Sequence, residues 1–323
     1  STPPPATSSA PAIPTSPLTG LPLTAGTPGP VLVVKLDNTH NAQPHAGLER
    51  ADVVYLEEVE YGITRIAAVF SGDIPDRIGP VRSARITDLD LLAQYGSPAF
   101  AFSGAQHKMW PAIAEAPVID ISPNKGAQGY ARDHTRRAPY NYFLDGQVGL
   151  SRAPKASIAR DIGFAFDAAP PADGTPIERA SMRWSEASAR FTYDPATGLY
   201  RVNLNGRRAR AEAAGQGQQA ATVVIQAVHQ EPSKYFDKGG GNTPHADTIG
   251  SGNAIILRDG MAYDATWNRP DASSGTTFTR LDGSPMPFKP GQVWVVLLNE
   301  TTPPTLIPSI ADATGSAGPS PSH

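Results

Sequence analysis

Cysteine is absent from the 323 residues of the sequence, which excludes disulfide bonds, thiolate metal sites and cysteine nucleophiles within them. Charge is also scarce, because charged residues make up 18% of the chain and the net charge at pH 7 is only -3. A broad basic field that would attract nucleic acid or an anionic membrane surface is therefore missing, and recognition of an anion has to be local. The sequence also lacks an apolar run of about 18 residues or more, the length that predicts a transmembrane helix.

Proline is plentiful, with 33 residues in 323, which is about twice the usual share of roughly 5%. The opening segment, residues 1–17, is rich in Ser, Thr, Pro and Ala, and residues 310–323 have the same character. Such segments cannot bury a core, so we expect a disordered tether at the start and a disordered tail at the end. The tether is similar to the spacer that follows a lipidated N-terminal cysteine in bacterial lipoproteins, and a leftover from expression is the alternative.

Residues 18–165 alternate between strand and helix signals, which predicts a mixed α/β N-terminal domain. A helix is expected from Thr87, with Asp90 at the third position completing its cap and Gly96 ending it. The runs at 51–60 and 64–70 are separated by a short turn and predict a hairpin. Further strands are expected at residues 31–36 and 99–103.

The composition changes at residues 166–175, a Pro, Gly and Ala segment that we interpret as a linker between domains. Beyond it, nearly all signals are those of strands, with turns predicted at Asp259-Gly260 and Asp282-Gly283. We therefore expect a mostly antiparallel β C-terminal domain over residues 176–309, either a sandwich or an open barrel. The predicted fold class is α+β, with the mixed α/β domain first.

Two carboxylates in the predicted hairpin are candidate catalytic groups. Glu58 and Glu60 are two apart on a predicted strand, so they share a face with their backbones about 6.6 Å apart. A pair at such a spacing can serve as acid and base in hydrolysis of a glycosidic bond. The alternative is that they neutralise Arg65, Arg82 or Arg85 in a structural ion-pair network.

The segment GPVRSAR, residues 79–85, is the best candidate for anion binding. Arg82, Ser83 and Arg85 directly precede the predicted helix start, where free backbone N–H groups favour an anion. Guanidinium groups add bidentate recognition of carboxylate or phosphate, and Arg65 is placed to contribute. The alternative is that these arginines only pair with glutamates inside the fold.

A second polar cluster lies in RDHTRRAPYN, residues 132–141. If it folds against GPVRSAR, it adds cations, a carboxylate and an imidazole that can move protons near neutral pH. An exposed loop held by Arg–Asp pairs is the alternative interpretation. The candidates in this segment are Asp133 and His134 for catalysis and Arg132, Arg136 and Asn141 for ligand binding, and His107 is a further ligand-binding candidate.

Metal and cofactor sites are not predicted. Asp37, His40 and His45 lie close together in the sequence, but their spacing matches no recognised metal motif, and the same holds for His245 and Asp247. The later aromatic residues fall on predicted strands, where they are expected to be core residues. These are Tyr263, Trp267, Phe278 and Trp294.

Several motifs together resemble the YerB-like family of bacterial lipoproteins, a family of unknown function with paired N- and C-terminal regions. The motifs are PLTG, KLDN, GLERADVVYLEEVEYGITR, IGPVRSAR, RDHTRRAPYN, SGNAIILRDGMAYDATW and PFKPGQVWVVLL. The resemblance covers both predicted domains and implies an envelope location, anchored to the outer face of the cytoplasmic membrane, without supplying an activity. The usual family form has glycine where this chain has Tyr61, so the expected close backbone approach is in question there.

Three functions fit these observations. The first is an extracytoplasmic, lipoprotein-type protein that binds an anionic envelope ligand, such as a glycan, a phosphate or a lipid-linked group, through the arginine cluster. The second is a hydrolase or transferase of envelope polymers that uses the paired glutamates with the Arg, His and Asp cluster. The third is a protein-docking scaffold. We expect no cofactor, no nucleic-acid partner, and contact with the membrane only through an N-terminal lipid anchor.

Overall fold

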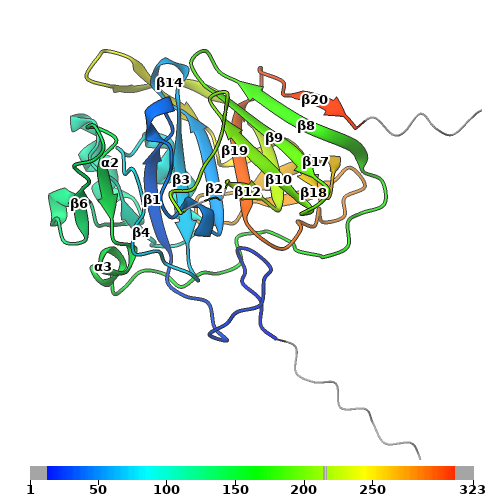
Figure 1. The fold of residues 1–323 in the computed structure, drawn as a ribbon, viewed down its shortest axis with the longest axis horizontal. Coiled ribbons are helices and arrows are strands. Elements are labelled where there is room, and N and C mark those ends of the chain that lie inside the picture. Colours follow the sequence, from blue (N-terminus) through cyan, green and yellow to red (C-terminus); the bar gives the residue numbers. More distant parts are fainter. Residues whose placement is uncertain (1–12, 214, 216, 310–323) are drawn as a thin grey trace, which may run out of the picture.

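The structure is a computed structural model that describes residues 13–213, 215 and 217–309 (Figure 1). The predicted tail and most of the predicted tether lie outside these residues. Within the tether, Thr15 pairs with Pro22 in an isolated bridge and Ser16 is buried, so the folded part begins before residue 18.

Helices are few and short among the described residues. The α-helices are α1 (Ile86–Ala93), α2 (Trp110–Glu115) and α3 (Gly146–Ser151), and the 3-10 turns are η1 (His40–Ala42), η2 (Leu48–Arg50), η3 (Glu60–Gly62), η4 (His107–Met109) and η5 (Pro123–Lys125). The strands of the first half are β1 (Leu32–Asp37), β2 (Val53–Glu58), β3 (Thr64–Phe70), β4 (Ala99–Ala101), β5 (Ile119–Asp120), β6 (Tyr130–Arg132) and β7 (Tyr142–Leu144). The strands of the second half are β8 (Thr175–Arg183), β9 (Ser188–Asp194), β10 (Leu199–Leu204), β11 (Arg207–Arg208), β12 (Gln219–Ala220), β13 (Thr222–Val228), β14 (Gln230–Phe236), β15 (Asn242–Ala246), β16 (Gly250–Arg258), β17 (Met261–Arg269), β18 (Thr277–Arg280), β19 (Val293–Asn299) and β20 (Thr305–Pro308).

A large mixed sheet runs through both halves of the chain. Its main path is β11-β10-β9-β8-β17-β16-β13-β19-β2-β3-β1-β4-β5. The late strand β19 lies between β13 and β2 and is parallel to both. The protein is therefore mainly β. The predicted division into an α/β domain and an antiparallel β domain is only partly correct, because strands from both halves belong to this sheet. The boundary at residues 166–175 stays a prediction.

The central strands are buried on both faces, which explains their continuous apolar sequences. Leu32, Val34 and Leu36 of β1 pack into one core, while Val31 and Val33 pack into the other. Strands β2 and β19 divide their side chains in the same way. The predicted strands at 31–36 and 99–103 and the β2–β3 hairpin are confirmed.

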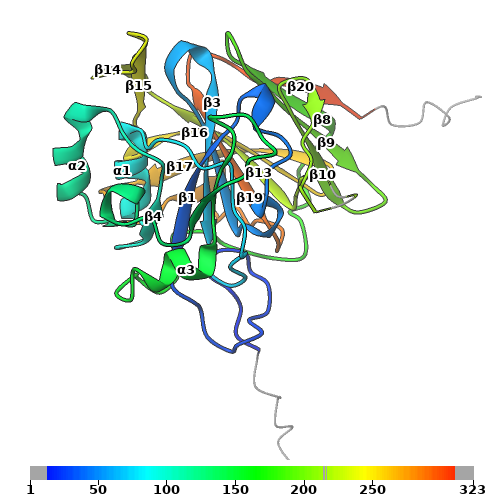
Figure 2. The same cartoon turned by 60° about the vertical axis from the view of Figure 1, so that its left-hand side comes forward.

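Different elements cover the two faces of this sheet. Leu92 of α1 and Ile113 of α2 belong to one core, on the side where Figure 2 places these helices. Strands β8, β9 and β10 cover the other face (Figure 1). The ring of Phe191 in β9 lies 5.7 Å from that of Trp294 in β19. The aromatic residues expected in the core, Tyr263, Trp267, Phe278 and Trp294, are all buried.

The turn between β2 and β3 is held from two sides by other hairpins. Ser185 and Glu186, at the tip of the β8–β9 hairpin, hydrogen-bond to the carbonyl groups of Tyr61 and Gly62. On the other side, the β14–β15 hairpin contacts the same turn and α1. This turn is the point where the predicted site residues gather.

Candidate functional site

Charged side chains form a row across β1, β3 and β2. Arg65 is the cross-strand partner of Asp37 on one side and of Glu57 on the other, so the three side chains project from one face. Lys35, two residues before Asp37, shares that face. It is the face covered by α1, because Val33 of the same strand packs in the core that contains the helix.

The inner part of the row is a buried triad of one lysine and two carboxylates. Lys35 forms ion pairs with Glu57 and, at 2.6 Å, with Asp88 of α1, and all three side chains are shielded from solvent. Burial, together with the charge of Asp88, raises the pKa of Glu57 to about 7, although Lys35 and Arg85 oppose the shift. Glu57 was not among the predicted site residues.

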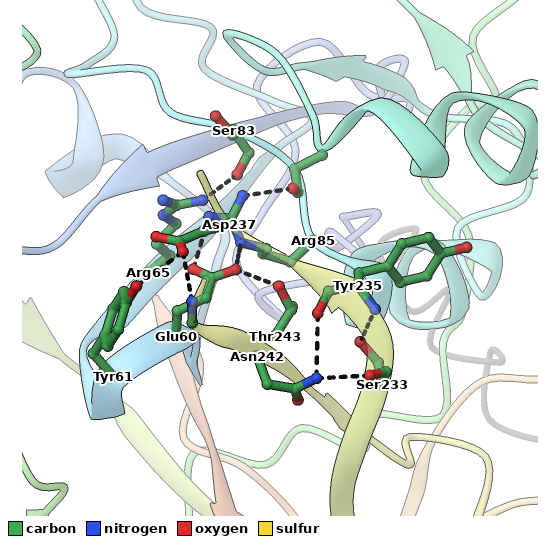
Figure 3. Close-up of polar contacts among 12 residues, drawn as sticks. Glu60, Tyr61, Arg65, Ser83, Arg85, Ser233, Tyr235, Asp237, Asn242 and Thr243 are labelled. Atoms are coloured by element: carbon green, nitrogen blue, oxygen red, sulfur yellow. Dashed lines mark hydrogen bonds and ion pairs between the residues drawn. The ribbon is translucent and has the colours of Figure 1, made fainter. Parts of the chain in front are cut away.

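The next pair links the β2–β3 turn to the start of α1 (Figure 3). Arg85 Nη2 donates to Glu60 Oε2 at 2.7 Å, and Arg85 Nε lies 2.5 Å from Oε1. The hydroxyl of Thr243 in β15 also donates to Glu60. Burial alone would raise the pKa of Glu60, but the hydrogen bond and charge of Arg85, with the Thr243 hydroxyl, hold it below the usual value.

Glu58 and Glu60 are not the same-face pair that the sequence predicts. Strand β2 ends at Glu58, and Glu60 begins the 3-10 turn η3, so the alternation of a strand does not reach it. Glu60 is buried against Arg85, whereas Glu58 lines a separate groove of about 240 Å³ together with Tyr61 and Glu231. Partial burial raises the pKa of Glu58.

Arg65 and Arg82 complete the outer part of the network. Arg65 is buried and donates through Nη1 to the carbonyl of Ser83 at 2.8 Å, and its Nε has no partner among the described residues (Figure 3). Burial, with repulsion from Arg85 and Arg82, lowers the pKa of Arg65 to about 9. Arg82 Nε donates to Asp37 at 2.6 Å, and the Arg82 side chain is 26% exposed.

The helix after GPVRSAR begins two residues earlier than predicted. Arg85 has extended backbone and precedes the first helical residue, and its N–H donates to the Asp88 carboxylate at 2.7 Å. Thr87, the predicted cap, lies inside α1, where its hydroxyl accepts a hydrogen bond from the N–H of Ala246 in β15. The prediction of the cap residue was therefore wrong, because Asp88 rather than Asp90 stands at the third position.

The second polar cluster forms its own set of contacts. Strands β6 and β7 pair as a hairpin beside residues 78–81, where the Val81 N–H donates to the carbonyl of Tyr142. Arg132 donates to Asn141 Oδ1 at 3.0 Å, and its guanidinium lies 4.8 Å from the centre of the Tyr142 ring. The hairpin therefore lies beside GPVRSAR in the backbone.

The remaining charges of this cluster face other partners. Asp133 pairs with Arg77 at 2.7 Å, and Arg136 donates to the carbonyls of Ala42 and Pro44. His134 and His107 are exposed. Within the described part of the chain, no hydrogen bond or ion pair joins Asp133 or His134 to Glu58 or Glu60. The structure thus does not assemble the predicted catalytic set.

Tyr61 lies at the outer edge of the site, under the tip of the β14–β15 hairpin (Figure 3). It adopts the left-handed backbone conformation, with φ of 61°, that a glycine would adopt without strain. Its hydroxyl donates to Asp237 at 3.0 Å. The ring occupies the space above Gly241, where a Cβ atom would lie 2.4 Å from the ring. The tyrosine is accommodated because the facing loop is glycine.

Residues considered for metal binding have other roles. Asp37 is bound by Arg82 and by Thr39, and His45 is buried with Nε2 2.7 Å from the Asp37 carbonyl. Across the residues that the structure describes, no group of three or more His, Cys, Asp or Glu could hold a metal ion. Nor does any helix in the described part have the length and apolar character needed to cross a membrane.

Comparison with known proteins gives consistent matches over both halves of the chain. Residues 18–159 match the N-terminal domain, and residues 180–295 the C-terminal domain, of the family described as "Protein of unknown function (DUF3048)". A curated relative from Bacillus subtilis (strain 168), named "Putative lipoprotein YerB", is 23% identical over 279 residues, covering 82% of this chain and 80% of the relative. The resemblance predicted from the sequence motifs is confirmed.

The fold also matches a solved structure. The crystal structure of the YerB protein from Bacillus subtilis has a TM-score of 0.76 to this chain at 18% sequence identity. The match covers 90% of this chain and 99% of that one. The match therefore extends over both halves of the fold.

Proposed function

This chain belongs to the DUF3048 family, and from that membership we propose that it is an extracytoplasmic lipoprotein that binds an anionic ligand of the cell envelope. The proposed location, at the outer face of the cytoplasmic membrane, is supported by the name of the curated relative. Contact with the membrane would be through an N-terminal lipid anchor. The proline-rich residues 1–17 would act as the spacer.

The accessible guanidinium of Arg82 is the observation that carries this proposal. Its Nε is bound to Asp37, and among the described residues no hydrogen bond occupies its other nitrogens. Arg65 is buried nearby, and burial, followed by repulsion from Arg85 and Arg82, lowers its pKa. An anion at Arg82 would reduce that repulsion and gain charge-assisted hydrogen bonds.

The other arginine of GPVRSAR would act indirectly. Arg85 is buried and its carboxylate partner is Glu60, so it positions the start of α1 instead of reaching the ligand. Arg132, which lies on the hairpin beside this segment and is exposed, would extend the contact surface toward Asn141. The ligand would therefore be held by Arg82 at the centre and by the β6–β7 hairpin at the side.

The chemistry of the site fits a phosphate or carboxylate group. Glycan phosphates, peptidoglycan carboxylates and lipid-linked diphosphates all offer oxygen pairs that a guanidinium binds in a bidentate manner. Within the described segment GPVRSAR, Arg82 presents its guanidinium to solvent whereas Arg85 is buried, so a single anionic group is expected to make the main contact. Binding should weaken with salt, because the contact is solvent-exposed.

Isothermal titration calorimetry with pyrophosphate at low ionic strength tests the proposal. Arg82→Gln should weaken pyrophosphate binding about tenfold or more, since a hydrogen bond to a charged group contributes about 1.5–3 kcal/mol. Arg280→Gln is the matched control, because Arg280 is 23% exposed and paired with Asp173. Absence of binding by the wild-type chain, or an equal loss in Arg280→Gln, would overturn the proposal.

An envelope-polymer hydrolase or transferase is the second candidate function, and Glu58 is the observation that favours it. Its carboxyl has a raised pKa and lines a groove, as a general acid requires. Incubation with purified envelope fractions should then release reducing ends, phosphate or stem peptides, and Glu58→Gln should abolish the release. If wild-type protein releases nothing and binds no pyrophosphate, a protein-docking scaffold becomes the better interpretation.

A further inference from the structure

A groove of about 730 Å³ lies where the β8, β9 and β10 strands meet the end of β1 and the start of β3. Its volume is within the range of about 300–1,000 Å³ that is typical of small-molecule sites. Residues 38–40 and 63–64 line one wall, residues 181–190, 203 and 205–206 another, and residues 302–303 and 305 contribute a third. Neither the outer arginines nor Glu58 line it, so it is separate from the sites described above.

The strand wall of this groove is a row of polar side chains set by the register. Ser181 of β8 is the cross-strand partner of Thr305 in β20 and of Arg190 in β9, and Arg190 in turn is opposite Asn203 in β10. Cross-strand partners share a face, so these side chains form one continuous row. The intervening residues point the other way and are buried in the core; they include Ala180, Met182, Ala189, Phe191, Val202 and Leu204.

Two of the residues that line the groove each have a buried polar atom without a hydrogen-bond partner among the described residues. These atoms are Oδ1 of Asn38, a residue 1% exposed, and Nε1 of Trp184, a residue 8% exposed. A buried polar atom that stays unpaired destabilises the folded state. A ligand in the groove would lie against both residues.

Polar groups of this kind match a hydroxyl-rich ligand. A sugar hydroxyl both donates and accepts, so it can satisfy the acceptor of Asn38 as well as the donor of Trp184. Ser, Thr and Asn side chains elsewhere in the lining offer the same mixture. A peptide strand, in contrast, usually adds along the free edge of a sheet, whereas this wall is the face of four paired strands.

We propose that this groove binds a saccharide chain, with Ser181, Arg190 and Asn203 along one side and Asn38 and Trp184 at its base. The inference takes from the proposed function only the envelope location, where glycan chains are available. It does not use Arg82 and does not depend on anion binding. The protein would then hold two chemically different parts of the envelope, one hydroxyl-rich and one anionic.

Titration of the full chain with two soluble probes, the N-acetylglucosamine tetramer and cellotetraose, tests the proposal by calorimetry and by NMR of the indole N–H groups. Binding of either probe should shift the Trp184 indole signal, which Trp184→Phe identifies. The indoles of Trp267 and Trp294 already donate, to Ala227 and Gln292, and should shift little. Asn203→Ala should weaken binding about tenfold, the loss expected for hydrogen bonds made by a desolvated amide.

Matched variants separate this site from a general effect on folding. Asn253→Ala in β16 changes an exposed strand asparagine outside the groove and should leave saccharide binding unchanged. Thr305→Ala changes an exposed member of the polar row and should weaken binding even if Asn203→Ala does not fold. Arg82→Gln should leave saccharide binding intact, and Asn203→Ala should leave pyrophosphate binding intact. Failure of both tetrasaccharides to bind, or equal loss in Asn253→Ala, would overturn the proposal.

Discussion

Both carboxylate oxygens of Glu60 lie against the Arg85 guanidinium: Oε2 accepts a hydrogen bond from Nη2, and Oε1 lies next to Nε. This ion pair joins the β2–β3 turn to Arg85, the residue that directly precedes α1. Thr243, from a hairpin more than a hundred residues later in the chain, donates to the same carboxylate. Three segments that are distant in sequence therefore meet at one buried charge. The contact explains why the predicted anion cradle is partly closed from within.

Replacing Glu60 by glutamine should destabilise the protein strongly. The variant leaves the Arg85 guanidinium buried without its counter-charge, and removal of one partner from a buried pair costs about 3–5 kcal/mol. Urea unfolding followed by circular dichroism measures the loss. Asp73→Asn is the control, because its pair with Arg50 is exposed and should contribute less than about 1 kcal/mol. Similar losses of unfolding free energy in the two variants would show that the buried Arg85–Glu60 pair stabilises the protein no more than the exposed Arg50–Asp73 pair.

The buried Glu57 should make stability fall as the pH rises. Its folded pKa of about 7 lies above the usual value of 4.5, so between these values the folded state holds a proton that the unfolded state has released. Stability contributed by that proton is complete below pH 4.5 and is lost as the pH approaches 7. Between about pH 5 and 7 the loss should be on the order of 2 kcal/mol.

The variant Glu57→Gln isolates this contribution. It cannot titrate, so the difference in unfolding free energy between variant and wild type should shift in favour of the variant as the pH rises. Glu178→Gln, at an exposed carboxylate, should show no such trend. If the difference in unfolding free energy between Glu57→Gln and wild type does not change across this pH range, the raised pKa of Glu57 is contradicted.

Gly241→Ala should displace the Tyr61 ring from the β14–β15 hairpin. The new Cβ atom would lie 2.4 Å from the ring, which has to swing away and give up its hydrogen bond to Asp237. A modest loss of about 0.5–1.5 kcal/mol is expected. In a Tyr61→Ala background the same change should cost nothing, and thermal unfolding of the four variants of this cycle measures the coupling. Additive effects would mean that the two residues do not interact.

His245 should titrate above an ordinary histidine. Asp90 accepts a hydrogen bond from it at 2.8 Å and raises its pKa, while burial opposes the shift. Attachment of β15 to α1 through this pair is fully present below pH 6.5 and weakens as the pH rises through the folded pKa. Asp90→Asn should lower the pKa of His245 in an NMR titration, whereas Asp271→Asn, at an exposed aspartate, should not. An unchanged value in Asp90→Asn would contradict the assignment.

Much of the local structure could be predicted from residue patterns. The apolar run at 31–36 and the hairpin at 51–70 follow from hydrophobicity and turn residues, and Asp259-Gly260 forms the turn between β16 and β17 as expected. The start of α1 was missed by two residues because Thr87 and Asp88 both have capping side chains. The Thr87 hydroxyl is instead bound to the N–H of Ala246 in β15, a contact that has no local signature in the sequence.

The site residues were harder to predict for a physical reason. Strand β2 is buried on both faces, so its sequence does not alternate and gives no indication that Glu57, instead of Glu58, points toward α1. The groove at Trp184 depends on the register of strands that are more than a hundred residues apart. Such relationships arise from the sheet order and have no local signature.

Strand β19 completes the centre of the sheet, although it comes near the end of the chain. During synthesis from the N-terminus, the residues of β2 and β13 are therefore made before those of the strand that joins them. Until residues 293–299 arrive, each of these strands has an unpaired edge, which is an attractive surface for another partly folded copy. Deletion of roughly the last thirty residues would therefore remove β19 and divide the sheet between β13 and β2, which leaves an exposed edge on each part.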